Sequence, residues 1–406
     1  MTTEHRVRGM PRIDTTDIRA SSSTTARDMN RDLILGLIRV RQPISRAALA
    51  RLTSLQRSTV SEIVQQLVNE NWIREGSVGR VPRGRRPTLL ELNSLLAVVA
   101  VDIHPLQTTV VVSDVNGRFV AQERIPIASL PTKAVEQLAA CIKRMQAACS
   151  DMTFVGIGIS VPGRLDPERH KLLFAPNLKW QGFDLKGTME LATGLSVELE
   201  NDANACLLAE MWFGEMEGVH DAVMVAIGEG VGTGILANGQ LIRGSSGMAG
   251  EFGHISLDPR GPLCGCGNKG CWETFASTRS AVRFYNKSSR PGKGVAAPEL
   301  LRLGVEGDPR AFQALQRQAR QIGRGIRAIV AALSPEIIFI AGDVTALWDD
   351  LQPEIEAELK EHPLGGPPPK LVPAHDSGIA RLRGACALVL HRSMGREHVS
   401  GKATAH

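Results

Sequence analysis

The chain has 406 residues, 43% hydrophobic and 22% charged, a composition typical of a folded protein with room for two or three domains. No stretch approaches the roughly 18 apolar residues of a membrane span, and the N-terminus lacks the apolar core of a secretory signal, so we expect a cytoplasmic protein with no membrane span. The net charge of +5 is uneven: residues 1–90 contain 16 Arg, no Lys and 8 acidic residues, whereas the remainder has a net charge of −3, which favours a polyanion-binding module attached to a different kind of domain.

Residues 1–27 are rich in Ser, Thr and Arg and have no apolar period, which predicts a disordered tail. Helical periodicity begins at residue 28. The expected apolar face of this first helix is formed by Leu33, Leu35, Leu37 and Ile38. Two shorter helices follow, with Ser45 at the N-cap position of the first of them and a tight turn near residues 53–55.

The helix after this turn starts with polar side chains of the kind that a recognition helix presents to bases and phosphates. These candidate DNA contacts are Gln56, Arg57, Ser58 and Thr59. Extended runs at 72–75 and 88–92 flank a loop rich in Gly and Arg, which predicts a β-hairpin wing. Its candidate contacts with a minor groove or with phosphates are Arg80, Arg83, Arg85 and Arg86. Residues 28–94 are therefore predicted to form a winged helix-turn-helix DNA-binding domain; the alternative is a helical bundle with a solvated basic loop.

From residue 95 the sequence pattern changes to runs of β-branched residues that alternate with helical patterns. Asn116-Gly117 is a strong hairpin signal between two such runs. The alternation continues to about residue 394 and indicates an α/β body with mixed sheets. Residues 395–406 are expected to be a loose tail.

A compact group of metal-ligand side chains lies inside this body. His254, Cys264, Cys266 and Cys271 have the spacing His-x9-Cys-x-Cys-x4-Cys, interleaved with glycines. Three thiolates and one imidazole suit tetrahedral Zn²⁺, and four protein ligands leave no open position, so we expect a structural zinc ion rather than a catalytic one. A chance cluster of buried thiols, or a pair of disulfides in a secreted protein, is the alternative.

Two carboxylates, Glu251 and Glu273, bracket these ligands, so a bound metal would fix them beside one imidazole and create a rigid site for a hydroxyl-rich ligand. The segments GEFGH and CGCGNKGCWE resemble the signature of the ROK family, named for repressors, open reading frames and kinases. The resemblance covers roughly residues 95–394. It implies a two-lobed actin-like (ribonuclease H-like) sugar-kinase fold, preceded by a winged helix-turn-helix as in the family's repressor branch.

The resemblance also implies a sugar site. The segment ENDANA at residues 200–205 is similar to a family segment in which the aspartate acts as general base on a sugar hydroxyl and its asparagine neighbour binds the sugar. The sugar-binding residues implied in this way are Asn201, Asp202, Glu251, His254, Glu273, Gly163 and Asn177. For any one of the acidic residues, a helix cap is the alternative.

The nucleotide site, by contrast, departs from the family pattern. The family's first phosphate loop has the form Asp-x-Gly-Gly-Thr, whereas this chain has His104 and Pro105 after Asp102. These residues remove the backbone freedom that phosphate binding needs. The later loop at 228–234 is rich in glycine, but it carries Glu229 and is a weak signal that a tight turn would also explain. We therefore expect no enzyme activity and expect Asp202 to serve as a sugar ligand rather than a base.

Together these features predict a sugar-responsive transcriptional regulator, most simply a repressor. Its expected partners are operator DNA and a small sugar or sugar derivative, and its expected assembly is a homodimer or a dimer of dimers. Because no further basic group stands out for a phosphate, a free sugar is favoured. Two alternatives remain: an ATP-dependent sugar kinase that carries a DNA-binding module, and a DNA-bound scaffold whose sugar site is idle.

Overall fold

The structure is a computed structural model that describes residues 23–78, 87–105, 107–166, 171–175, 177–214, 216, 218–287, 294–361 and 366–394. Three predictions fall wholly or mainly outside these residues: the tail at residues 1–27, of which only 23–27 are described and lie in a helix, the wing arginines Arg80, Arg83, Arg85 and Arg86, and the tail at residues 395–406. The described residues form two compact units, one that ends at Leu92 and one that begins at Asn93.

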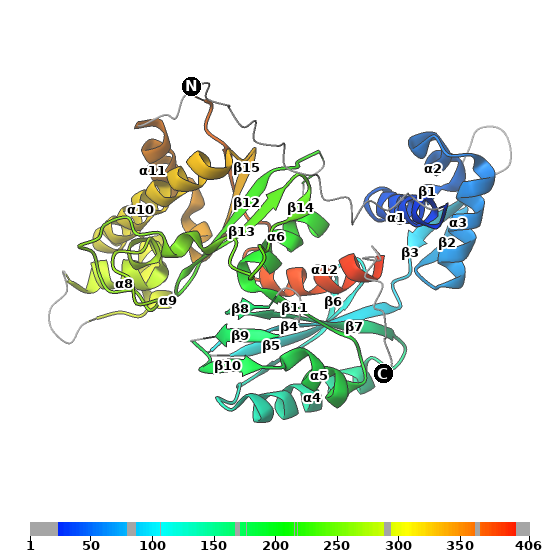
Figure 1. Ribbon diagram of the computed structural model, residues 1–406, viewed down its shortest axis with the longest axis horizontal. Coiled ribbons are helices and arrows are strands. Elements are labelled where there is room, and N and C mark those ends of the chain that lie inside the picture. Colours follow the sequence, from blue (N-terminus) through cyan, green and yellow to red (C-terminus); the bar gives the residue numbers. More distant parts are fainter. Residues whose placement is uncertain are drawn as a thin grey trace, which may run out of the picture. The chain divides into compact units, whose positions relative to one another are not determined.

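The N-terminal unit consists of three helices followed by a β-hairpin, in the predicted order (Figure 1). Its elements are α1 (Ser23–Arg41), β1 (Ile44–Ser45), α2 (Arg46–Thr53), α3 (Arg57–Asn69), β2 (Ile73–Val78) and β3 (Thr88–Leu92). The three strands pair in the order β1-β3-β2. Ser45 caps α2 as predicted, because its side chain accepts a hydrogen bond from the backbone N–H of Ala48.

Two details of α1 differ from the sequence prediction. The helix begins at Ser23, five residues before the expected start, because its first turns contain no residue that breaks a helix. Its buried face is formed by Ile34, Leu35 and Ile38, whereas Leu33 is 48% exposed. The predicted face was thus rotated by about one position, since Ile34 and Ile38 lie one turn apart and Leu33 does not share their side of the helix.

The body begins with a five-stranded sheet of order β11-β7-β4-β5-β6. Its strands are β4 (Leu96–Asp102), β5 (Thr108–Asp114), β6 (Phe119–Ile125), β7 (Thr153–Val161) and β11 (Val197–Asn201). Helices α4 (Pro131–Ala148) and α5 (Leu185–Thr193) bury one face of it. A small sheet of β8 (Arg164–Leu165), β9 (Leu172–Ala175) and β10 (Trp180–Phe183) adjoins β11. Because β4, β7 and β11 are parallel, their carboxyl ends share one edge, where ligands bind in such folds.

A second five-stranded sheet has the order β14-β13-β12-β15-β16. Its strands are β12 (Ala222–Ile227), β13 (Val231–Ala237), β14 (Gln240–Leu241), β15 (Ile337–Gly342) and β16 (Lys370–Pro373). The short elements nearby are η1 (Glu251–His254), α7 (Glu273–Ala276) and η2 (Asp343–Leu347). A helical layer covers one face: α8 (Thr278–Lys287), α9 (Ala297–Val305), α10 (Pro309–Leu333) and α11 (Trp348–Glu361) (Figure 1).

Two helices lie between the sheets of the body. Helix α12 (Ala380–Met394) packs on β4, β7 and β11 of the first sheet, while α6 (Asp202–Phe213) packs on β12 and β13 of the second, and the two helices pack against each other (Figure 1). Glycines permit this close approach. A Cβ on Gly384 would lie 1.9 Å from the carbonyl oxygen of Ala205, and one on Gly158 would lie 1.9 Å from that of Ala385. The body therefore has the two-lobed α/β architecture that was predicted.

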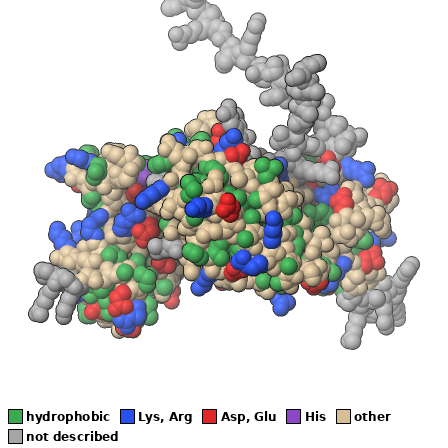
Figure 2. Space-filling model, turned by 90° about the horizontal axis from the view of Figure 1, so that it is seen from below, with side chains coloured by type: hydrophobic (Ala, Val, Ile, Leu, Met, Phe, Trp, Pro, Cys, Tyr) green, Lys and Arg blue, Asp and Glu red, His purple; other side chains and the backbone are tan. Residues whose placement is uncertain are grey.

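None of the helices in the described part of the chain has the length and apolar character required to traverse a bilayer. On the face drawn in Figure 2, basic and acidic side chains are interspersed among neutral and apolar ones. Neither observation changes the predicted architecture.

Candidate sugar and metal site

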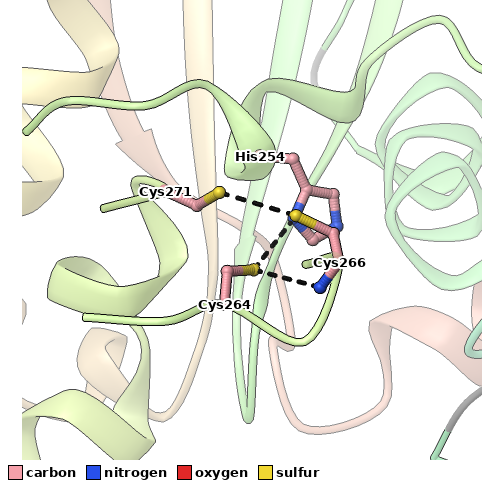
Figure 3. Close-up of side chains that lie close together, drawn as sticks. All are labelled: His254, Cys264, Cys266 and Cys271. Carbon is pink, nitrogen blue, oxygen red and sulfur yellow. Dashed lines mark hydrogen bonds between the residues drawn. The ribbon is translucent and has the colours of Figure 1, made fainter. Parts of the chain in front are cut away.

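The four predicted metal ligands, His254, Cys264, Cys266 and Cys271, converge in one place (Figure 3). Their ligand atoms all lie within 4.8 Å of one another. The Sγ atoms of Cys266 and Cys271 are 3.6 Å apart, and Cys264 Sγ is 3.5 Å from Nδ1 of His254. A disulfide bond is about 2.0 Å long. The thiols are therefore free, which excludes the disulfide alternative in this structure.

The arrangement fits a tetrahedral ion of the zinc type. With Zn–S bonds of about 2.3 Å, tetrahedral geometry places two thiolates roughly 3.8 Å apart, close to the separation seen here. The surrounding chain turns tightly at Gly267 and Gly270, whose φ angles are +92° and +63°. A Cβ on Gly270 would lie 1.7 Å from the carbonyl oxygen of Asp258, so a larger residue does not fit at this point of the loop.

The imidazole of His254 connects this cluster to two carboxylates. Its Nδ1 faces the thiols, while its Nε2 lies 3.7 Å from Oε2 of Glu251. On the other side, Oε1 of Glu273 is 3.8 Å from Nδ1 and 2.9 Å from Cys264 Sγ. Burial raises the pKa of Glu251 despite the opposing effects of His254 and Arg164. A metal bound through Nδ1 would therefore orient the ring and fix both carboxylates around it.

Glycines also hold η1 against β13. Gly250 adopts a φ of +86°, and its carbonyl accepts a hydrogen bond from the Thr233 hydroxyl. A Cβ on Gly253 would lie 2.0 Å from the carbonyl oxygen of Val231, and one on Gly230 would lie 2.7 Å from Oε2 of Glu273. Glycine at these positions thus lets the backbone of β13 approach the segment that carries the candidate site.

Asn201 and Asp202 lie at the junction of β11 and α6, as the strand-helix reading of ENDANA predicts. The side-chain oxygen of Asn201 caps α6 by accepting from the N–H of Ala203 at 2.9 Å. Its side-chain nitrogen donates to the carbonyl oxygen of Gly163 at 3.0 Å. The Asn201 side chain therefore connects the start of α6 to the loop at Gly163, and Gly163 takes part through its backbone carbonyl. The side chain of Asp202 accepts from the same N–H of Ala203.

A buried glutamate, which we did not single out from the sequence, ties this junction to the other lobe. Glu200 is 4% exposed and accepts from the Asn204 side chain at 3.0 Å and from the backbone N–H of Asn201 at 2.9 Å. Its other oxygen accepts from Nε of Arg243 at 2.9 Å. Arg243 precedes η1 in the chain, so this ion pair joins the two segments that carry Asp202 and Glu251.

Sequence reasoning also missed a cation at the carboxyl edge of the first sheet. Nε of Arg381, from α12, is 3.0 Å from both carboxylate oxygens of Asp102 at the end of β4. Burial raises the pKa of Asp202, and Asp102 acts in the same direction, while Arg381 and His104 lower it. The signal in the sequence that could have indicated Arg381 was the presence of an arginine close to the start of a largely apolar helix.

The glycine-rich loop at 228–234 and Asn177 are placed differently from the residues above. Gly228–Gly230 form a tight hairpin turn between β12 and β13, and Glu229 pairs with Arg279 at 3.2 Å, which agrees with the tight-turn alternative. Asn177 is exposed at the turn between β9 and β10. Among the contacts of the described residues, none joins Asn177 to the other candidate sugar ligands.

The candidate DNA contacts that the structure describes lie at the start of α3. Gln56 occupies the N-cap position without a capping bond from its side chain, and Gln56, Arg57 and Ser58 are exposed. Thr59 is half-buried. An exposed helix N-terminus with polar and basic side chains suits contact with phosphate.

Comparison with known proteins identifies the family of the chain. The chain is 30% identical over 344 residues to a xylose repressor of Caldicellulosiruptor bescii, a match that covers 81% of this chain and 86% of that protein. Its structure superposes on that of a ROK family transcriptional regulator, a homologue of the Escherichia coli MLC protein, with a TM-score of 0.78, 27% identity and coverage of 91% and 97%. A ROK family glucokinase from Streptomyces griseus, solved with glucose and AMPPNP, matches with a TM-score of 0.64, 31% identity and coverage of 72% and 98%. Residues 98–392 match the ROK family, and the chain belongs to it.

Proposed function

We propose that the chain is a sugar-responsive transcriptional repressor of carbohydrate metabolism genes. The observation that carries this proposal is the convergence of Glu251, His254 and Glu273 on one metal-ligand cluster, in a chain that matches a regulator of the family over 91% of its length. Residues 28–94 would be the winged helix-turn-helix DNA-binding domain, and residues 95–394 the sugar-binding domain.

In this proposal the sugar binds between the lobes of the body. Asp202, Glu251 and Glu273 accept hydrogen bonds from its hydroxyls, His254 contributes its ring, and Asn201 and Gly163 position the loop beside them. Asn177 would come from the β9–β10 turn. A zinc ion held by His254 and the three cysteines sets the frame, as a structural site with four protein ligands does. Thiolate ligands persist in a reducing compartment, so we place the protein in the cytoplasm.

The DNA response follows from unequal affinity of the sugar for two arrangements of a homodimer. The exposed N-terminus of α3 in each subunit, with Gln56, Arg57, Ser58 and Thr59, would contact one operator half-site, and the wing arginines would contact the backbone or the minor groove. In one of these arrangements the spacing of the two α3 helices does not match the spacing of the operator half-sites. A sugar that favours this arrangement lowers the population that binds DNA. Operator DNA must then weaken the affinity of the protein for the sugar by the same factor by which the sugar weakens its affinity for DNA.

The test is fluorescence anisotropy of the pure protein on its own upstream DNA, with xylose, glucose and their phosphates, and without ATP. One sugar is expected to release the DNA. Asp202→Ala should bind DNA like the wild type but need roughly 10 to 100 times more sugar, since it loses a hydrogen bond to a charged group. Sugar release that persists unchanged in Asp202→Ala would refute the assignment of this site.

The DNA-binding half is tested separately by salt dependence. Arg57→Ala should weaken binding to all sequences and reduce the slope of log affinity against log salt by about one, as expected for one lost phosphate contact. Lys143→Ala, which removes an exposed positive charge from α4, is the matched control and should leave the slope unchanged. Equal slopes for Arg57→Ala and the wild type would remove α3 from the interface.

A sugar kinase is the second candidate, because a glucokinase shares the body of the chain at 31% identity. Against it stand His104 and Pro105 in the expected phosphate loop, and the ion pair that already engages Asp102. A coupled assay for ATP-dependent phosphorylation of the same sugars decides between the two. Turnover that depends on Asp202 would establish the kinase.

A further inference from the structure

Two aspartates lie at the carboxyl edge of the first sheet. Asp102 ends β4 and Asp202 starts α6 directly after β11, with β7 between the two strands. Like charges that lie near each other destabilise each other's ionised form. Burial raises the pKa of Asp202, and the charge of Asp102 adds to this rise. A pair of this kind needs a counter-cation if both carboxylates are to stay ionised.

The chain supplies that cation itself. The Nε of Arg381 lies 3.0 Å from Oδ1 and 3.0 Å from Oδ2 of Asp102, and the Asp102 side chain is 13% exposed. The guanidinium also acts on Asp202, whose ionised form it favours. The other charged groups that face Asp202 are His104, from the chain after β4, and Glu251 on η1. The side chain of Arg381 is 40% exposed, so it lines the space beside Asp202 rather than lying in a core.

We propose that Arg381 is a positioning residue for the sugar site: it serves as the permanent counter-cation of Asp102 and Asp202. Arg381 thereby favours the ionised form of Asp202, which accepts a hydrogen bond from a sugar hydroxyl, without help from a bound metal–nucleotide complex. Sugar sensing is then independent of Mg²⁺ and of nucleotide. The inference rests on the proposed function, because it concerns the same sugar site.

The test is a double-mutant cycle on sugar affinity, measured by calorimetry with xylose and glucose as probes. Arg381→Gln should weaken binding about tenfold, because it removes the cation and leaves the like charges of Asp102 and Asp202 uncompensated. Asp102→Asn in the same protein should restore affinity to within about threefold of the wild type, since it removes the repelling partner. Arg392→Gln is the matched control: it removes an arginine that pairs with Glu198 near the other end of α12, and should change nothing.

Each outcome decides the question. Unchanged affinity in Arg381→Gln, or an equal loss in the double variant Asp102→Asn/Arg381→Gln, would overturn the inference. Mg²⁺ that strengthens sugar binding by the wild type would do so as well, because a metal rather than Arg381 would then neutralise the pair. If Arg381→Gln does not fold, the double variant Asp102→Asn/Arg381→Gln, which buries no unpaired carboxylate at position 102, still tests the charge argument. No binding of any sugar by the wild type would instead refute the proposed function and the inference with it.

Discussion

A single methyl group added at Gly325 on α10 should disturb the candidate metal site through Trp272. Trp272 lies between the candidate metal ligand Cys271 and the candidate sugar ligand Glu273. It is 1% exposed and donates its indole N–H to the carbonyl oxygen of Gln321 at 2.8 Å. Its ring lies directly on Gly325. A Cβ at Gly325 would be 1.9 Å from Cε2 of the indole and 2.3 Å from Nε1. In Gly325→Ala the ring must therefore move by roughly 1.5 Å to reach a normal contact distance.

The net cost follows from three contributions. Overpacking of a buried ring costs about 1–3 kcal/mol, and loss of the indole hydrogen bond adds about 1 kcal/mol. Replacement of a glycine by alanine in a helix interior stabilises the folded state by up to about 1 kcal/mol and offsets part of this cost. We expect Gly325→Ala to lower stability by about 1–3 kcal/mol, which corresponds to a fall in Tm of roughly 2–5 °C for a unit of this size. Because Trp272 adjoins Cys271, the variant should also lose bound zinc faster to a chelator.

Calorimetry measures the first effect, and zinc release followed with a colorimetric chelator measures the second. Gly36→Ala is the matched control, because Gly36 lies inside α1 with no atom near the added Cβ. This control should stabilise its own unit by up to about 1 kcal/mol and leave zinc release unchanged. A Gly325→Ala protein with wild-type Tm and wild-type zinc release would show that Trp272 does not support the metal site.

Three further predictions concern single side chains. Cys266→Ser should lose zinc and the sugar response together, and mass spectrometry that finds the metal content unchanged would remove Cys266 from the ligand set. Glu251→Gln should raise the sugar dissociation constant with little effect on Tm; equal binding in calorimetry would exclude this contact. Glu210 is 3% exposed and burial raises its pKa, so the folded state holds the proton more tightly than the unfolded state. The contribution of Glu210 to stability therefore falls as the pH rises from about 4.3, its value in the unfolded chain, through its raised pKa in the folded state. Glu210→Gln keeps an acceptor for the His375 N–H and should flatten that part of the profile of Tm against pH.

The sequence predicted those features whose residues lie close together in the chain. The metal ligands occupy one short loop, so their spacing alone placed them together, and the Asn116-Gly117 turn and the cap at Ser45 are likewise local. The face of α1 was misplaced because adjacent apolar residues leave its phase ambiguous. Ile34 and Leu33 are both apolar, and only tertiary packing decides which of them is buried.

The ion pairs of the site could not be predicted in this way. Asp102 and Arg381 are separated by 279 positions, and Glu200 and Arg243 by 43. Neither pair has a period or a motif, because each contact arises only when segments far apart in the sequence pack together. Arg381 lies in a largely apolar helix, which is a weak sign of a buried partner, but nothing in the sequence indicates which acid that partner is.

The connection between the two units of the chain sets a limit on how they can be separated. Strand β3 ends at Leu92 and β4 begins at Leu96, so three residues join the hairpin of one unit to the central strand of the other. Three residues span at most about 11 Å. The same β4 runs on to Asp102, beside the candidate sugar site. A flexible insertion in this segment would leave both proposed ligand sites intact but would let each unit reorient independently of the other. An exchange of DNA-binding units between relatives must therefore preserve the length of this segment if the exchanged unit is to remain under sugar control.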